Sequence, residues 1–414
     1  MWAKSEHEIP ESQFQQRIAR VREFVIQQGL SCVVAYSAPK VHQWGQTGHV
    51  GYLTNWSNLD RITDTMVVIP REGEPVLLVA GVEYMLEQIS EVSWIRDVRL
   101  VGSPDLRAIS SSYTPNIAGE EASTETRSFG KEINHILKDN GCDGLPIGIS
   151  GIESMPVTIY RDLTSSIESG IAEIDDIVAK LRQIKTPEEM TIIKKVAAIS
   201  DLSYQTMIEE LEDGVWGYEL TAEMDRTAKR SGADFVYHCM HTAPGGDLLA
   251  GKLSIKAHDC RLHKGDYINV NAYVVYKGYW IQSDRAGTIG KRLGSVASEA
   301  VDANLRVQDN VIEAIKPGLP IKELIRIGDE AAERFGYRIQ GGRIGHGQGL
   351  DYSEQPFLIA GSEKILTPGN VFVLHVCLEI PGTNILINPI ADLCHVTKDG
   401  VEVLNKFPRE VFHV

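Results

Sequence analysis

The sequence predicts a smaller α/β domain followed by a larger α+β domain. Its 414 residues exceed the length of one typical domain of about 150 residues, so we expect two domains. In the first third, patterns typical of strands and of helices alternate, which favours an α/β domain. In the remainder, helical patterns cluster in the middle and strand patterns follow, which favours an α+β domain. We place the boundary near residue 175, so that the domains span 1–175 and 176–414.

The elements of the first domain follow from apolar periodicity and from turn residues. Apolar side chains at helical spacing predict a helix that Gly29 ends, and the apolar run after it predicts a buried strand. The segment Pro-Arg-Glu-Gly-Glu at 70–74 predicts a hairpin. The tract 103–126, rich in Ser, Thr, Pro and Gly, is expected to be a surface excursion. Helices are expected over 14–28 and 131–140, and strands over 30–36, 65–69, 75–79 and 146–149.

A capping box marks the first long helix of the second domain. Thr186 stands at the N-cap position, Pro187 lies in the first turn, and Glu189 completes the box. Further helices are expected over 218–231, 295–315 and 321–335, and strands over 267–275, 371–377 and 393–396.

The charge and the cysteines limit the class of protein. The chain has 41 Lys and Arg against 56 Asp and Glu, a net charge of −15, whereas nucleic acids and anionic membranes require a basic surface. No apolar run is long enough to span a bilayer, and the N-terminus is charged where a signal peptide is apolar. The six scattered cysteines form no CxxC pair, which is typical of buried thiols in a reducing compartment. We expect a cytoplasmic protein that binds a small molecule, and neither nucleic acid nor membrane.

Five segments of the second domain form an ordered set of motifs. They begin at Arg182 (RQIKTPEE), Lys264 (KGDYINVN), Gly278 (GYWIQSD), Gly345 (GHGQGL) and Pro368 (PGNVFVLH). In this order they resemble the creatinase/prolidase/methionine-aminopeptidase superfamily, which includes peptidase family M24. The resemblance covers essentially the whole chain. It implies an α+β pita-bread catalytic domain preceded by a smaller α/β domain of the creatinase N-terminal type.

The metallopeptidases of this superfamily hold two divalent ions through two aspartates, a histidine and two glutamates. The resemblance places Asn271, Asp284, His346, His375 and Ala391 at these five positions. Three of the five therefore lack the expected carboxylate. Two neighbouring cations repel each other, so a shared site depends on that negative charge. We expect a degenerate metal site without a dinuclear centre.

Creatinase-like members, which the chain resembles most, hydrolyse their substrate without a metal and also carry asparagine at the position of Asn271. The resemblance implies that Arg61 binds a substrate carboxylate, in cis or across a dimer interface, a task that suits a planar guanidinium. The proton-shuttling histidine of creatinase falls near Ser254 here. The alignment does not choose among the neighbouring histidines, of which His241 and His258 are taken as substrate-binding candidates.

We expect the side chains of Asp284, His346 and His375 to converge and carry the chemistry, with Glu379 at the end of the same strand as His375. His346 lies in a glycine-rich segment, which we interpret as a loop where the backbone approaches a ligand closely. His375 could equally be a core histidine. A neutral imidazole would take a proton from water or return one to the leaving nitrogen, and Asp284 would orient the ring or hold a cationic group.

The leading hypothesis is a creatinase-like hydrolase that cleaves a C–N bond of a small polar, carboxylate-bearing substrate and requires no cofactor. An open sheet face needs a cover, so we expect a homodimer with composite active sites. The alternative is a mononuclear metal enzyme, a lyase or an oxidative enzyme, with one Fe, Zn or Mn ion on Asp284, His346 and His375. A proline-type peptidase and a non-catalytic pita-bread binding module are further alternatives.

Overall fold

The structure is a computed structural model that describes residues 8–38, 48–56, 63–81, 84–101, 128–246, 248, 259–380, 382 and 386–414. The chain divides into two compact units, Met1–Arg182 and Gln183–Val414. The division lies at Arg182 rather than at residue 175, because helix α7 (Ile177–Arg182) packs against α1, α2 and β5 of the first unit.

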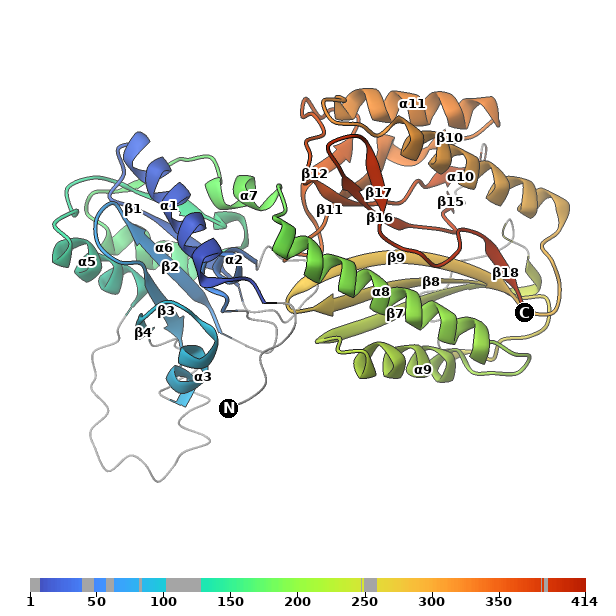
Figure 1. Ribbon diagram of the computed structural model, residues 1–414, viewed down its shortest axis with the longest axis horizontal. Helices are drawn as coiled ribbons and strands as arrows, with labels where there is room; N and C mark the ends of the chain where they lie inside the picture. Colours follow the sequence, from blue (N-terminus) through green and yellow to red (C-terminus); the bar gives the residue numbers. More distant parts are fainter. Residues whose placement is uncertain are drawn as a thin grey trace. The chain divides into compact units, whose positions relative to one another are not determined.

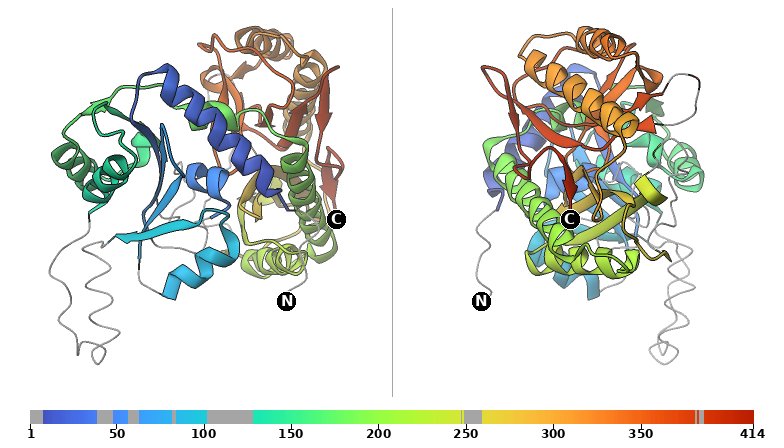
Figure 2. Two further views of the ribbon diagram at one scale, coloured as in Figure 1. Left: turned by 60° about the vertical axis from the view of Figure 1, so that its left-hand side comes forward. Right: turned by 90° about the vertical axis from the view of Figure 1, so that its right-hand side faces the viewer.

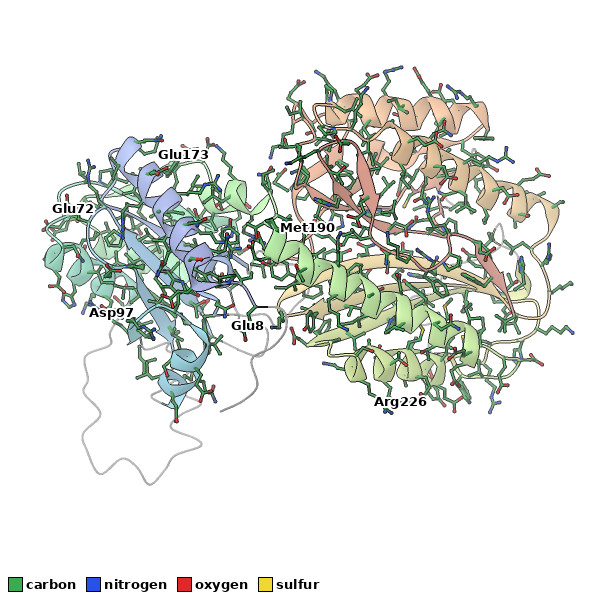
Figure 3. All side chains as sticks on the ribbon, in the orientation of Figure 1. Glu8, Glu72, Asp97, Glu173, Met190 and Arg226 are labelled. Atoms are coloured by element: carbon green, nitrogen blue, oxygen red, sulfur yellow. The ribbon has the colours of Figure 1, made fainter. Side chains whose placement is uncertain are left out.

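The first unit is built around a six-stranded mixed sheet with the strand order β4-β3-β2-β1-β5-β6 (Figure 1). β1 pairs antiparallel with β2 and parallel with β5, and all of its residues are buried. β2 and β3 form the predicted hairpin. Glu72, labelled in Figure 3, lies in its turn. The strands are β1 (Cys32–Ser37), β2 (Thr65–Pro70), β3 (Val76–Ala80), β4 (Asp97–Val101), β5 (Ile147–Ser150) and β6 (Ile171–Ala172).

The two helices predicted for the first unit are present. α1 buries Phe14, Ile18, Val21 and Val25, which recur at helical spacing. α5 begins after Ser128, whose side chain caps the helix by accepting from the amide of Lys131. The tract 103–126 lies outside the described residues. The helices other than α7 are α1 (Glu11–Gln27), α2 (Gly48–Thr54), α3 (Tyr84–Val92), α5 (Phe129–Asp139) and α6 (Val157–Ser166).

The second unit begins with the helix that the capping box predicts. The Thr186 hydroxyl accepts from the amide of Glu189 over 3.3 Å, and the Glu189 carboxylate accepts from the amide of Thr186 over 2.9 Å. Met190, labelled in Figure 3, lies in the first turn. The helices of this unit are α8 (Pro187–Glu210), α9 (Gly217–Arg230), α10 (Ser295–Ala314) and α11 (Ile321–Arg334).

Two larger sheets form the body of the second unit, with the orders β18-β9-β8-β7 and β12-β11-β13-β16-β17. A backbone bridge between Asp284 on β9 and Ala391 joins them. α8 and α9 lie together against β7–β9, and α10 and α11 lie together as a second helix pair (Figures 1 and 2). The strands are β7 (Phe235–Ala243), β8 (Tyr267–Tyr276), β9 (Tyr279–Thr288), β11 (Arg343–Gly347), β12 (Glu354–Ile359), β13 (Val371–Leu374), β16 (Asp392–Val396), β17 (Val401–Val403) and β18 (Val411–His413). A small third sheet contains β10 (Arg338–Ile339), β14 (Leu378–Glu379) and β15 (Leu386–Ile387).

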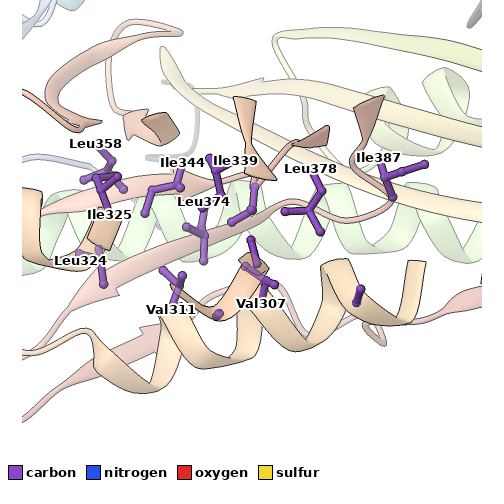
Figure 4. Close-up of a cluster of buried hydrophobic side chains, with 14 of the residues drawn as sticks. Val307, Val311, Leu324, Ile325, Ile339, Ile344, Leu358, Leu374, Leu378 and Ile387 are labelled. Atoms are coloured by element: carbon purple, nitrogen blue, oxygen red, sulfur yellow. The ribbon is translucent and has the colours of Figure 1, made fainter. Parts of the chain in front are cut away.

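An extensive apolar core lies between the second helix pair and the second sheet. Val307 and Val311 of α10 pack with Leu374 of β13, as the close-up shows (Figure 4). Leu324 and Ile325 of α11 belong to the same cluster. This core fixes β11, on which His346 lies, and β13, which His375 follows. No helix among the described residues is both long and apolar enough to cross a membrane.

His241, a predicted substrate-binding residue, lies on strand β7 together with His238. The structure corrects two local interpretations. His346 also lies on a strand, β11, rather than in a loop. The strand expected over 371–377 ends at Leu374, although the amide of His375 still donates to the carbonyl of Ile344.

Candidate active site

Polar side chains line up across the middle of the sheet β7-β8-β9. The register places Cys239 opposite Asn271, and Asn271 opposite Asp284. Residues directly opposite one another share a face of the sheet, and alternate residues along a strand return to that face. His241 on β7 and Tyr273 on β8 therefore lie on the same face as Asp284.

The carboxyl group of Asp284 is fully buried, and burial raises its pKa to about 6. Hydrogen bonds from Asn271 and Asn388 oppose this rise. Asn388 Nδ2 donates to Oδ2 over 2.8 Å, whereas Oδ1 has no hydrogen-bond partner. One oxygen of a buried carboxylate therefore remains to accept from a ligand.

The imidazole of His346 has a defined tautomer. Its Nδ1 lies 3.1 Å from the carbonyl oxygen of Gly347. A carbonyl can only accept, so Nδ1 carries the proton and Nε2 is an acceptor. Nε2 is buried and has no hydrogen-bond partner. Burial lowers the pKa of His346 to about 4, so the ring is neutral at neutral pH.

The glycines around His346 serve close packing between strands rather than the approach of a ligand. A Cβ atom on Gly345 would lie 2.1 Å from the carbonyl oxygen of Val373 on β13. A Cβ atom on Gly347 would lie 2.4 Å from the carbonyl oxygen of Gln355 on β12. Only glycine allows β11 to lie this close to both neighbours, which holds His346 in place.

His375 follows β13 directly and meets His346. The two ring centroids are 5.3 Å apart and the ring planes are inclined by 66°. Burial, with smaller contributions from His346 and Arg343, lowers the pKa of His375 to about 3. Its ring hydrogen-bonds to its own backbone, and Nε2 has no partner. The structure thus brings together two neutral imidazoles whose Nε2 atoms can accept.

The carboxylate of Asp284 affects the pKa of two neighbouring residues, Cys377 and Tyr352. Burial and, to a smaller extent, the carboxylate of Asp284 together raise the pKa of Cys377 to about 11. Burial and the same carboxylate also raise the pKa of Tyr352. The ring of Tyr352 lies 5.3 Å from that of His346, centroid to centroid. The carboxylate of Asp284 therefore acts on two residues, Cys377 and Tyr352, that lie near the histidines in the sequence or in space.

His241 on β7 is linked to Asp284 through Asn271. It is hydrogen-bonded to Asn271, which also hydrogen-bonds to Asp284. Its Nε2 lies 3.8 Å from the sulfur of Cys239, and its Nδ1 is buried without a partner. Burial lowers the pKa of this ring as well.

A row of aromatic rings leads from the protein surface to His346. Tyr237 is 40% exposed, and its ring centroid lies 6.1 Å from that of Tyr273. Tyr273 lies 5.4 Å from Tyr352, which contacts His346. Our sequence analysis did not identify these tyrosines. The sequence did contain one indication of their role. Tyr237 and Tyr273 stand two residues from Cys239 and Asn271 on their strands, and therefore point to the same face of the sheet.

Asn388 is a second residue that the sequence analysis missed. It lies between β15 and β16, donates to Asp284, and its own Oδ1 is buried without a partner. Its only signal in the sequence is that it stands shortly before Ala391, one of the five positions that the resemblance marks.

Three further predicted residues are Glu379, Arg61 and His258. Glu379 is on β14, in the separate third sheet, opposite Arg338, and not on the strand that precedes His375. His238, which neighbours the site along β7, is a structural histidine, because its Nδ1 lies 2.6 Å from Asp225 and its Nε2 lies 3.0 Å from Ser203. Arg61 and His258 lie outside the described residues, so their predicted roles stay predictions.

The described side chains do not fit a metal centre. No group of three or more His, Cys, Asp or Glu residues within the described ranges is placed so that it could hold a metal ion. The predicted ligand set of Asp284, His346 and His375 therefore does not form a metal-binding group among the described residues. Of the five positions that the resemblance marks, only Asp284 offers a carboxylate, and one of its oxygens accepts from Asn388. This donor set does not fit two divalent ions.

Comparison with known proteins gives consistent results. A model of the family described as metallopeptidase family M24 matches residues 191–401, about half of the chain. An Xaa-Pro dipeptidase of Pyrococcus furiosus is 29% identical over 314 residues, covering 72% of this chain and 85% of that protein. The structure of an Xaa-Pro dipeptidase from Bacillus anthracis has a TM-score of 0.74 at 20% identity, covering 97% of this chain and 100% of the other. The prolidase of Pyrococcus horikoshii has a TM-score of 0.74 at 22% identity, with 96% and 99% covered.

The structural likeness confirms the predicted fold, an N-terminal α/β domain followed by a pita-bread domain. The chain belongs to metallopeptidase family M24.

Proposed function

We propose that this chain hydrolyses a C–N bond in a small substrate that carries a free amino group, of the proline-dipeptide type. The sequence analysis favoured a creatinase-like enzyme. The relatives named above are Xaa-Pro dipeptidases and a prolidase, and they support the proline-type alternative better. We therefore replace the leading hypothesis and retain its central element, cleavage of a C–N bond in a small polar molecule by acid/base chemistry.

The observation that carries this proposal is a set of buried acceptors in the second unit. His346 Nε2, His375 Nε2, Asp284 Oδ1 and Asn388 Oδ1 are all buried, all able to accept, and all without a partner. Unmet buried acceptors cost free energy until a ligand supplies donors. A protonated amino group supplies three N–H donors and a positive charge. The ring faces of Tyr273 and Tyr352 add a favourable environment for a cation.

The pKa values assign the base. Burial disfavours the charged form of every group, so it raises the pKa of a carboxyl and lowers that of an imidazole. Asp284, with a pKa of about 6, is therefore a stronger base than His346 at about 4 or His375 at about 3. Above pH 6 its carboxylate is ionised. This reverses the sequence-based expectation, in which an imidazole took the proton.

The reaction then needs only groups of this chain. Asp284 takes a proton from water as the water oxygen adds to the substrate carbonyl carbon. The C–N bond breaks, and the same proton passes to the leaving nitrogen. The two imidazoles and Asn388 hold the amino group. Because the donor set does not fit a metal centre, no step in this scheme passes through a metal ion.

The test is hydrolysis by the purified full-length chain. Ala-Pro is incubated with the protein, and free proline is measured by mass spectrometry. N-acetyl-Ala-Pro serves as the matched control, because it has the same scissile bond but no ammonium group. Creatine is assayed in parallel. We expect proline from Ala-Pro and at least tenfold less from the acetylated control.

Three results would overturn parts of this proposal. Equal cleavage of both dipeptides would exclude the role of the amino group. Cleavage of creatine alone would restore the creatinase-like hypothesis. If no substrate of the panel is cleaved, but Ala-Pro binds with equal affinity to the wild type and to His346→Ala, the site is not a hydrolytic centre and the chain is a binding module.

The predicted homodimer with composite active sites remains a proposal, because Arg61 lies outside the described residues. Arg61 would bind the carboxylate of the dipeptide, the end opposite the amino group. Mixing Arg61→Ala with His346→Ala protein tests it. Recovered turnover in the mixture supports a site shared between subunits, and a monomer at micromolar concentration excludes one.

A further inference from the structure

Behind Asp284, a buried ion pair joins the two larger sheets of the second unit. Asp284 and Ala391 are bridged through their backbones, with N–O distances of 3.2 Å in both directions. The next residue on each side, Arg285 on β9 and Asp392 on β16, is fully buried. Their side chains meet over 2.7 Å, from Arg285 Nη2 to Asp392 Oδ1.

The guanidinium of Arg285 binds the backbone bridge itself. Its Nη1 donates to the carbonyl oxygen of Asp284 over 2.8 Å and to that of Ala391 over 3.0 Å. Its Nη2 also donates to the carbonyl oxygen of Phe407 over 2.9 Å. One rigid, planar group thus fixes the two backbone segments that meet beside the candidate active site.

Asp392 is held from its other side. Its Oδ2 accepts from Arg409 Nε over 2.8 Å, and Arg409 also pairs with Asp309 on α10. The buried carboxylate therefore lies between two guanidinium groups, and both of its oxygens have partners. A buried pair of this kind contributes little net stability compared with apolar side chains of the same volume. Its distinctive property is a defined geometry.

We propose that Arg285 and Asp392 form a positioning unit that holds Asp284 and the segment at Ala391 in register. The resemblance assigns metal ligands to both of these positions, so in metal-bearing relatives the ions would link the two strands. In this chain the buried guanidinium makes that link through the backbone. Arg285 acts through Asp284 and is not itself a catalytic residue. The inference on register does not depend on the proposed function, but its consequence for turnover does.

The experiment compares hydrogen exchange of the full-length wild type with that of the apolar double variant Arg285→Met/Asp392→Leu. Exchange is followed by mass spectrometry in peptides that contain the amides of Asp284 and Ala391. We expect at least tenfold faster exchange there, and unchanged exchange in β7. Lys185→Met/Glu354→Leu is the matched control, because it removes another buried ion pair of the same unit and leaves the bridge intact.

The conservative variant Arg285→Lys covers the case in which the double variant does not fold. A single ammonium cannot reach all the acceptors of the guanidinium, so we expect an intermediate increase in exchange at the bridge. If the wild type cleaves Ala-Pro, kcat falls at least tenfold in the double variant, less in Arg285→Lys, and KM stays within about threefold.

The readouts separate the two proposals. If the wild type cleaves no dipeptide while exchange at the bridge increases in the variants, the positioning unit stands and the proposed function fails. If exchange at Asp284 and Ala391 is unchanged in a folded Arg285 variant, or increases equally in the Lys185/Glu354 control, the positioning proposal is overturned.

Discussion

His49 in the first unit and His346 in the second invite comparison, because both follow a glycine and both are almost completely buried. The two nitrogens of His49 both have partners, Asp176 Oδ2 at 2.8 Å from Nε2 and Arg182 Nη1 at 2.8 Å from Nδ1. His346 has a partner on Nδ1 only. Burial and local sequence are alike, and the difference lies in the unmet acceptor.

Asp176, which contacts His49, and Asp284, the proposed base, differ in the same way. Burial acts to raise the pKa of Asp176, but hydrogen bonds from His49, Ala179 and Gly151 hold it below its ordinary value. Burial raises the pKa of Asp284, and its hydrogen bonds only moderate the rise. A buried polar group with complete partners is structural, whereas one with an unmet atom is a candidate for ligand binding. Four predictions test this distinction.

The largest expected effect is on turnover. Asp284→Asn removes the proposed base but keeps the shape of the side chain, so turnover of Ala-Pro falls by about 10²- to 10⁴-fold. Asp176→Asn, the matched change in the first unit, lowers kcat by less than threefold. Steady-state kinetics measure both, and a reversed order would refute the distinction.

The second effect is on stability. His49→Ala removes a partner from a half-buried carboxylate and a buried guanidinium, so the free energy of unfolding falls by about 3 kcal/mol. His346→Ala removes a group with an unmet acceptor, so unfolding changes by about 1 kcal/mol or less. Urea denaturation distinguishes them. If both variants lose the same free energy of unfolding, the unpaired acceptor of His346 does not distinguish it from a structural histidine.

The third effect depends on pH and has opposite signs in the two units. Because the pKa of Asp284 is raised, this group favours the folded state at a pH below its ordinary pKa of about 3.9. That contribution to stability is lost as the pH rises through 6. Asp284→Asn therefore gains stability relative to the wild type between pH 4 and 7, by about 3 kcal/mol.

Asp176 has a lowered pKa, so it stabilises the fold above its ordinary value and loses this contribution as the pH falls. Asp176→Asn is therefore less stable than the wild type at pH 7, and the difference shrinks towards acid pH. Urea denaturation at pH 2.5, 4.5 and 7.5 measures all three proteins, because the contribution of Asp176 is lost only below its ordinary pKa of about 3.9. A gain for both variants with rising pH would contradict the assignment.

The smallest expected effect follows chelation. Treatment with EDTA and desalting leaves the turnover of Ala-Pro within about twofold of the untreated protein, because the described donor set does not fit a metal centre. Metal content is measured in parallel by mass spectrometry. Loss of turnover that Mn²⁺ or Zn²⁺ restores would show that the site holds a metal after all.

Much of the fold could be predicted because its signals are local. The capping box at Thr186 and the hairpin turn at 70–74 are encoded within a few residues, and both are present. Strand β7 was not predicted, because a strand and a loop are hard to distinguish in a short segment of mixed polar and apolar residues. His346 was misplaced because its glycines suggested a loop, whereas they permit close contact with Val373 and Gln355.

The sequence by itself determined the order of the elements and the family resemblance, and it predicted that Asn271, His375 and Ala391 stand in place of carboxylates. Only the tertiary structure decided which nitrogen of His346 is free, that burial raises the pKa of Asp284 and lowers that of both imidazoles, and that Asn388 contacts Asp284 while Tyr352 contacts His346. The physical reason is that pKa values and unmet hydrogen bonds depend on burial and partners. These come from strands that lie far apart in the sequence and meet only when the sheets have formed.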